Sequence, residues 1–183
     1  MAKAVGLLEL AGIAPGYVVA NEVGKQTSVD FWVADTLCPG RFLLVIFGDT
    51  ASVQMAMEMP VNLAKDEILS EGILANIDAE VFRALQSPGK VAAHQALGIV
   101  ETLAIAPAIL AADGALKTAQ VELVELRITG GMGGKALVCF AGEVDAVQVA
   151  LAHIRNLVDP VALASSVLLA SPHPELVAFW EQV

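Results

Sequence analysis

Residues 4–10 read AVGLLEL, and nearly the same stretch returns as ALGIVET at residues 96–102. At this offset of 92, nine of the 35 positions from 4 to 38 are identical to their counterparts, including Lys25 with Lys117. After two additional residues in the second copy, the offset becomes 94. A repeat of roughly 90 residues is a duplicated domain rather than a solenoid unit, because each copy is long enough to build its own core.

The duplication predicts two tandem domains, residues 1–88 and residues 91–183, joined by a turn-forming stretch at 86–90. In each copy the apolar runs and turn residues predict the order β-α-β-β-α-β, which is the ferredoxin-like unit of an α+β fold. The expected strands are 3–10, 29–36, 42–47 and 68–75 in the first copy, and 93–102, 121–128, 136–141 and 162–170 in the second. The expected helices are 15–28, one starting after 49, and 79–85, then 107–120, one starting after 143, and 174–182.

The composition restricts the classes of partner. Of 183 residues, 56% are hydrophobic and only 16% are charged, so we expect a folded chain that buries further apolar surface as an obligate oligomer. The net charge of −10 argues against nucleic acid and against an anionic membrane surface, because both need a basic footprint. No signal peptide and no bilayer-spanning stretch is visible, and two cysteines form no disulfide framework, which predicts a soluble protein in a reducing, intracellular setting.

The sequence contains no pattern typical of an enzyme. His94, His153 and His173 fall in different predicted elements without metal-ligand spacing, and no hydrolase, zinc or phosphate-loop motif is present. Asp49 and Glu143 precede the second helix of each copy, where a carboxylate caps free backbone N–H groups. We therefore predict that the protein is not an enzyme.

The loops between the second and third strands are the most unusual segments. In the first copy this loop contains Leu37, Cys38, Pro39 and Gly40, and in the second it contains Gly130, Gly131, Met132, Gly133 and Gly134. So many small residues suggest either a mobile hairpin or a loop crowded against copies of itself at a symmetry axis. Cys38 lies at a predicted loop tip, whereas Cys139 lies inside an apolar strand and is expected to be an inert core residue.

The two copies resemble the bacterial microcompartment shell domain. The resemblance rests on the opening ALGIVET, the stretch AAD at 111–113 with Lys117, VEL at 121–123, GEV at 142–144, and Pro-His at 172–173. It covers essentially the whole chain and is closer in the second copy. The arrangement of two domains and the Cys-Pro-Gly loop is similar to that of the tandem, trimeric shell proteins of the propanediol-utilisation type.

The resemblance implies a structural shell subunit, a homotrimer that forms a pseudo-hexameric tile. The loop residues given above would line its central pore, and Cys38 of three copies would hold one [4Fe–4S] cluster per trimer that passes electrons across the shell. Lys25 and Lys117 correspond to lysines at the tile edges, where other shell proteins would bind. An encapsulated or cytosolic redox enzyme would be a further partner. The arginine that often precedes Pro-His in these domains is absent, since Ser171 stands there.

Two other functions remain open at this point. The pore of a shell tile could conduct a small metabolite, with Cys38 unligated. Alternatively, a ferredoxin-like signalling trimer could bind a small ligand between its subunits. A cluster would colour the protein brown, and a signalling trimer would not form sheets.

Overall fold

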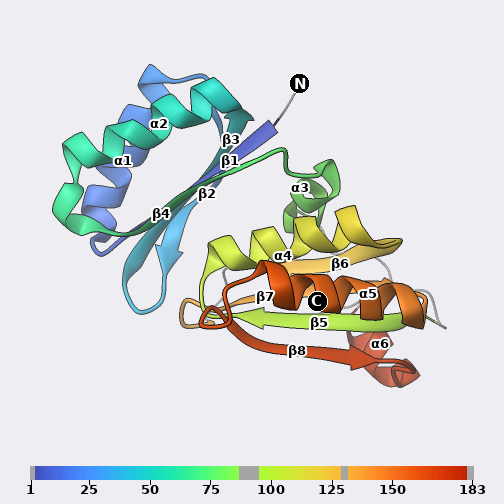
Figure 1. Cartoon of the computed structure of the whole chain (residues 1–183). Coiled ribbons are helices and arrows are strands. Elements are labelled where there is room, and N and C mark those ends of the chain that lie inside the picture. Colours follow the sequence, from blue (N-terminus) through green and yellow to red (C-terminus); the bar gives the residue numbers. More distant parts are fainter. Residues whose placement is uncertain (1–2, 87–94, 129–131, 181–183) are drawn as a thin grey trace. The chain divides into compact units, whose positions relative to one another are not determined.

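The structure of the chain, a computed structural model, describes residues 3–86, 95–128 and 132–180. Its internal contacts divide the chain into two compact units, residues 1–77 and residues 78–183. Each unit contains one four-stranded antiparallel sheet (Figure 1).

The first unit has the predicted β-α-β-β-α-β order. It consists of β1 (Lys3–Leu10), α1 (Ile13–Gln26), β2 (Asp30–Leu37), β3 (Arg41–Asp49), α2 (Thr50–Leu63), the 3₁₀ turn η1 (Lys65–Glu67) and β4 (Ile68–Ala75). The strands lie in the order β2-β3-β1-β4, and every neighbouring pair is antiparallel. This is the strand order of the ferredoxin-like fold, as predicted.

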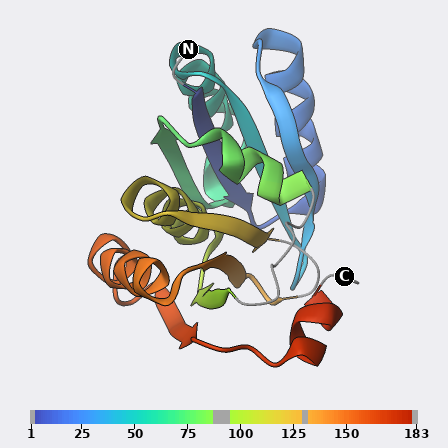
Figure 2. The same ribbon diagram turned by 90° about the vertical axis from the view of Figure 1, so that its right-hand side faces the viewer.

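The second unit repeats this arrangement and carries two additional helices. It consists of α3 (Ala79–Gln86), β5 (Ala96–Thr102), α4 (Ile105–Thr118), β6 (Val121–Arg127), β7 (Ala136–Gly142), α5 (Val144–Leu157), β8 (Leu163–Leu169) and α6 (Pro174–Trp180). The strand order is β6-β7-β5-β8. Helices α4 and α5 lie side by side on one face of this sheet, and α6 lies on the opposite side (Figures 1 and 2).

The helix starts differ in part from the prediction, because α1 and α4 begin at Ile13 and Ile105, two residues before the expected prolines. Proline is the third residue of both α1 and α4, within the first turn, where its missing N–H leaves no helical hydrogen bond unmade. Asp49 caps α2 as predicted, because its side chain accepts a hydrogen bond of 3.0 Å from the backbone N of Ser52. Glu143 occupies the same position before α5 but its side chain makes no cap bond, so the prediction of a second carboxylate cap was wrong. The longer glutamate side chain is a poorer cap than aspartate.

The predicted boundary between the domains differs from the boundary that the contacts give. The sequence repeat assigned residues 79–85 to the end of the first domain, which was expected to run to residue 88. In the structure α3 packs mainly against β6 and also against α4, so it belongs to the second unit. The linker at 86–90 lies almost entirely outside the described residues.

The two cores are packed with different residues at equivalent positions. In the first unit Gly16 of α1 packs against the fully buried ring of Phe42, and a Cβ at this glycine would lie 2.2 Å from the ring. In the second unit the corresponding positions hold Ala108 and Ala136, both fully buried. In one copy a large strand residue packs against a helix glycine, and in the other copy alanines occupy both of these positions.

We predict that Gly16→Ala destabilises the first unit. Close-packed cores cannot absorb a methyl group at 2.2 Å without displacing a side chain, which costs about 1–3 kcal/mol, more than the roughly 1 kcal/mol that alanine gains in helix propensity. Urea unfolding followed by circular dichroism measures the change. The same substitution should cost less in a Phe42→Ala background, because alanine lacks the Cγ and ring atoms that lie nearest to the added methyl group.

Gly24→Ala is the matched control in the same helix. Its Cβ would lie 3.3 Å from the end of the Phe31 side chain, and Gly24 is exposed, so this substitution should be neutral or stabilising. Equal destabilisation by both substitutions would contradict the packing argument.

Candidate functional site

The turn that carries Cys38 is tight and well defined. It connects β2 to β3 through a hydrogen bond of 2.9 Å from the backbone N of Gly40 to the carbonyl oxygen of Leu37. The Cys38–Pro39 peptide bond is cis, and Gly40 has a φ of +95°, which favours glycine. Leu37 is buried and anchors the turn, whereas the Cys38 side chain is exposed.

The corresponding loop of the second copy is described from Met132 onward. Gly133 and Gly134 have φ values of 64° and 88°, and the backbone N of Lys135 donates to the carbonyl oxygen of Met132 at 3.1 Å. The predicted loop residues Gly130 and Gly131 lie outside the described residues. No thiol stands in this loop, so the two copies differ in chemistry at this position.

An ion pair stands beside each of these loops. Arg41 Nη1 lies 3.6 Å from Glu9 Oε1 in the first unit, and Lys135 Nζ lies 2.7 Å from Glu101 Oε1 in the second. In each case the base lies at or directly before the start of the third strand, and the acid lies near the end of the first. Glu9 and Glu101 occupy the same place in the repeated stretch, but no ion pair was predicted for either, because the pairing depends on strand register.

The two cysteines have opposite surroundings. Cys139 is fully buried in β7, and burial, with a smaller contribution from the nearby Glu125 carboxylate, raises the pKa of its thiol to about 12. It is therefore a protonated core residue at neutral pH, as predicted. The exposed Cys38 remains available to a ligand.

Within the described parts of one chain, no group of three or more His, Cys, Asp or Glu residues could hold a metal ion. A cluster bound through Cys38 would therefore need cysteines from several copies. His153 lies on α5, and His173 caps α6 by accepting a bond of 3.3 Å from the backbone N of Glu175. His94 lies outside the described residues.

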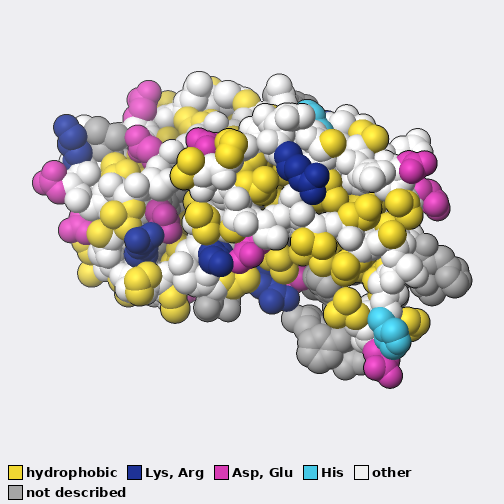
Figure 3. All heavy atoms as spheres, turned by 60° about the horizontal axis from the view of Figure 1, so that its bottom comes forward, with side chains coloured by type: hydrophobic (Ala, Val, Ile, Leu, Met, Phe, Trp, Pro, Cys, Tyr) yellow, Lys and Arg dark blue, Asp and Glu magenta, His cyan; other side chains and the backbone are white. Residues whose placement is uncertain are grey.

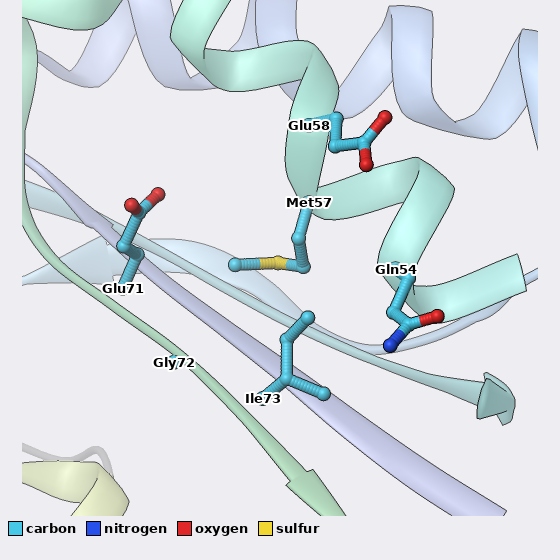
Figure 4. Close-up of a pocket in the computed structure, with 6 residues that line it drawn as sticks. All are labelled: Gln54, Met57, Glu58, Glu71, Gly72 and Ile73. Atoms are coloured by element: carbon cyan, nitrogen blue, oxygen red, sulfur yellow. The ribbon is translucent and has the colours of Figure 1, made fainter. Parts of the chain in front are cut away.

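One open hollow is present in the first unit, between α2 and β4 (Figure 4). It is lined by Gln54, Met57, Glu58, Glu71, Gly72 and Ile73. Its two carboxylates have no nucleophile or histidine beside them among these lining residues, so the hollow offers no catalytic arrangement.

Both predicted edge lysines lie in the last turn of the first helix of their copy. Lys25 is exposed and pairs with Glu22 at 3.2 Å, and hydrogen bonds from Gln26 and then Lys25 hold the pKa of Glu22 below its usual value. Lys117 pairs at 2.6 Å with the carboxylate of Asp113, which is buried. Each lysine thus has an acidic neighbour on its own helix, and both side chains still reach the surface.

Apolar side chains remain at the surface in many places. On the face drawn in Figure 3, groups of hydrophobic side chains are exposed between acidic and basic ones. Exposed large residues include Tyr17, Phe31, Leu176 and Val161. Among the described residues, no helix is both long and apolar enough to cross a lipid bilayer.

Comparison with known families and proteins agrees with the resemblance. The profile of the BMC domain family matches residues 4–77 and again residues 96–172. The bacterial microcompartment shell protein PduT of Citrobacter freundii is 40% identical over 148 residues, which is 81% of this chain and 80% of PduT. The carboxysome shell protein CsoS1A of Hydrogenovibrio crunogenus is 37% identical over 83 residues, which is 44% of this chain and 84% of CsoS1A.

Solved structures give the same picture. A microcompartment protein from Desulfitobacterium hafniense superposes with a TM-score of 0.89 at 37% identity, covering 95% of this chain and 97% of that one. The fused permuted hexameric shell protein MSM0275 superposes with a TM-score of 0.62 at 23% identity, covering 85% of this chain and 81% of that one. The second likeness concerns the fold alone.

Proposed function

Because this chain belongs to the BMC domain family, we propose that it is a structural tile of a bacterial microcompartment shell, assembled as a homotrimer with one [4Fe–4S] cluster at its central pore. Its place in the cell is a microcompartment shell in the bacterial cytoplasm. PduT, which is similar over most of the chain, is a shell protein, and this supports a structural rather than an enzymatic role.

The difference between the two β-hairpin loops is the observation that supports a cluster. The first copy presents the exposed thiol of Cys38 at the tip of its turn, and the second copy presents glycines in the corresponding loop. In a ring of three tandem chains the two kinds of loop would alternate, so three thiols would face one axis, separated by three glycine-rich loops.

The donor set fits an iron–sulfur cluster only in such an assembly. Clusters of this kind are held by cysteine thiolates, usually four, and one chain supplies one exposed thiol. Three copies of Cys38 would bind three irons, and the fourth iron would take a non-cysteine ligand. When bound, the cluster would supply one-electron transfer across the shell, with an encapsulated or cytosolic redox enzyme as partner.

Two measurements on anaerobically purified protein test the proposal. Sedimentation should give a single species of three times the chain mass of 19.0 kDa. The absorption spectrum, with iron and sulfide analysis, should show a brown protein with four irons per trimer. A dominant 19.0 kDa species would overturn the trimer.

The other two functions predict different results. A colourless, iron-free trimer that still forms sheets would replace the cluster with a pore for a small metabolite. A trimer that never forms sheets with itself or with other shell proteins would instead favour a ligand-binding signalling protein.

A further inference from the structure

Helix α3 shows how the end of one copy covers the next copy. By sequence it ends the first repeat, but it packs on β6 and α4 of the second. Its apolar residues Val81 and Ala84 are 0% and 7% exposed. The helix is fixed at its start, where the backbone N of Asp78 donates a hydrogen bond of 2.8 Å to the carboxylate of Asp113 on α4.

The corresponding face of the first copy has no such cover among the described residues. Tyr17 on α1 is 54% exposed, whereas its counterpart Ile109 on α4 is fully buried. Phe31 on β2 is 41% exposed, whereas its counterpart Leu123 on β6 is 9% exposed. Two large apolar side chains therefore face solvent at the place where the second copy carries a helix.

Helix α6 is the counterpart of α3 and has no following copy in its own chain. It begins in the same way, because His173 caps it by accepting from the N–H of the residue two positions later, just as Asp78 caps α3. Val177 on one side of α6 packs against the core of the second unit. Leu176 stands at the position of Val81 but is 41% exposed, so a side of α6 equivalent to the buried side of α3 faces solvent.

We propose that α6 of one copy docks on α1 and β2 of the next copy, as α3 docks on α4 and β6 within the chain. Leu176 would pack against Tyr17 and Phe31 of the partner, and His173 would lie next to Asn21, the counterpart of Asp113. The occupant is thus a second copy of this chain. The interface rests on the proposed homotrimer and specifies which surfaces hold it together.

The geometry of this contact explains a closed assembly. A contact between two different surfaces, the α6 end of one copy and the α1–β2 face of the next, is head-to-tail and generates a ring when the rotation closes. Each tandem chain contributes one such contact within itself, through α3, and one to its neighbour, through α6. In a trimer, three contacts within chains and three contacts between chains would alternate around the ring.

Chemical cross-linking tests the pairing. Asn21→Cys and His173→Cys are combined in a Cys38→Ser background, where Cys139 is buried and unreactive, and a short bis-maleimide is added. We expect covalent dimers and trimers and nothing larger, because the ring closes at three. Each single cysteine variant is a control and should give no covalent oligomer.

Substitution of the anchor residue gives a second readout. Leu176→Asp should weaken assembly on the order of a hundredfold or more, because it places an unpaired charge in the contact. Val161→Asp changes an 81% exposed residue by the same chemistry and should leave the mass of the assembly unchanged. Circular dichroism confirms that both variants are folded.

The outcomes separate the interface from the trimer. If sedimentation shows a trimer but the double-cysteine protein is not cross-linked and Leu176→Asp remains trimeric, the docking of α6 is wrong and the trimer stands. If the wild type and the background variant are monomeric, the proposed trimer and its interface both fail.

Discussion

Cys38→Ser should yield a colourless trimer without iron. The serine hydroxyl is a poor ligand for iron–sulfur clusters, which are held by thiolates. Because every chain of a trimer carries the substitution, all three thiolate ligands of the cluster are lost together. The side chain is exposed at the tip of its turn, and Gly40 and Leu37 still close that turn through their backbone hydrogen bond. We therefore expect iron and sulfide to fall to background while the sedimenting mass and the circular dichroism stay as in the wild type.

Cys139→Ser is the matched control for this experiment. Its thiol is buried in β7 and stays protonated at neutral pH, since burial raises its pKa to about 12. This variant should keep the wild-type iron content and colour, with at most a loss of stability from a hydroxyl placed in the core. Full iron and sulfide in Cys38→Ser, or none in anaerobically purified wild type, would disprove the cluster and leave the metabolite pore as the function.

The fold was predictable because the same order of apolar runs and turn residues occurs in both copies. The aligned stretches 4–10 and 96–102 both form the central strand β1 or β5, and the antiparallel order follows from the β-α-β-β-α-β pattern. A two-residue difference between copies falls in the loop region, where Gly133 and Gly134 adopt positive φ values. Such a loop absorbs an insertion without moving the strands.

The position of α3 was not predictable from the repeat. A repeat assigns a helix to the copy in which it is encoded, but its packing partner depends on where the chain leads after β4. The buried carboxylate of Asp113 shows this difference, because its counterpart Asn21 is exposed although the two helices align. The sequence showed the spacing of Asp113 and Lys117 but not that Asp113 also fixes the start of α3.

The contacts of the two lysines decide which substitutions test the tile-edge hypothesis. Lys117 lies beside the buried Asp113, so aspartate at position 117 would place two carboxylates one turn apart and destabilise the second unit. Glutamine removes the charge without this repulsion. Lys25 pairs with Glu22 on an exposed helix surface, where water screens the repulsion from a reversed charge.

We expect that Lys25→Asp combined with Lys117→Gln leaves the trimer intact and reduces sheet formation by at least roughly tenfold. In the proposed pseudo-hexameric tile, six edges would meet their neighbours in a flat lattice, and a reversed or missing charge at every edge would weaken each contact. Electron microscopy of the purified protein counts the sheets, and sedimentation checks the trimer. High salt should restore part of the assembly, because it screens charges at the surface.

Lys65→Asp is the control for a reversed charge elsewhere, since Lys65 is exposed in η1, which contacts the chain just before the start of α1, at the other end of that helix from Lys25. It should form sheets like the wild type. If the double variant also forms sheets normally, the two lysines do not contribute to the contacts between tiles. In that case the contacts between tiles would have to involve other residues.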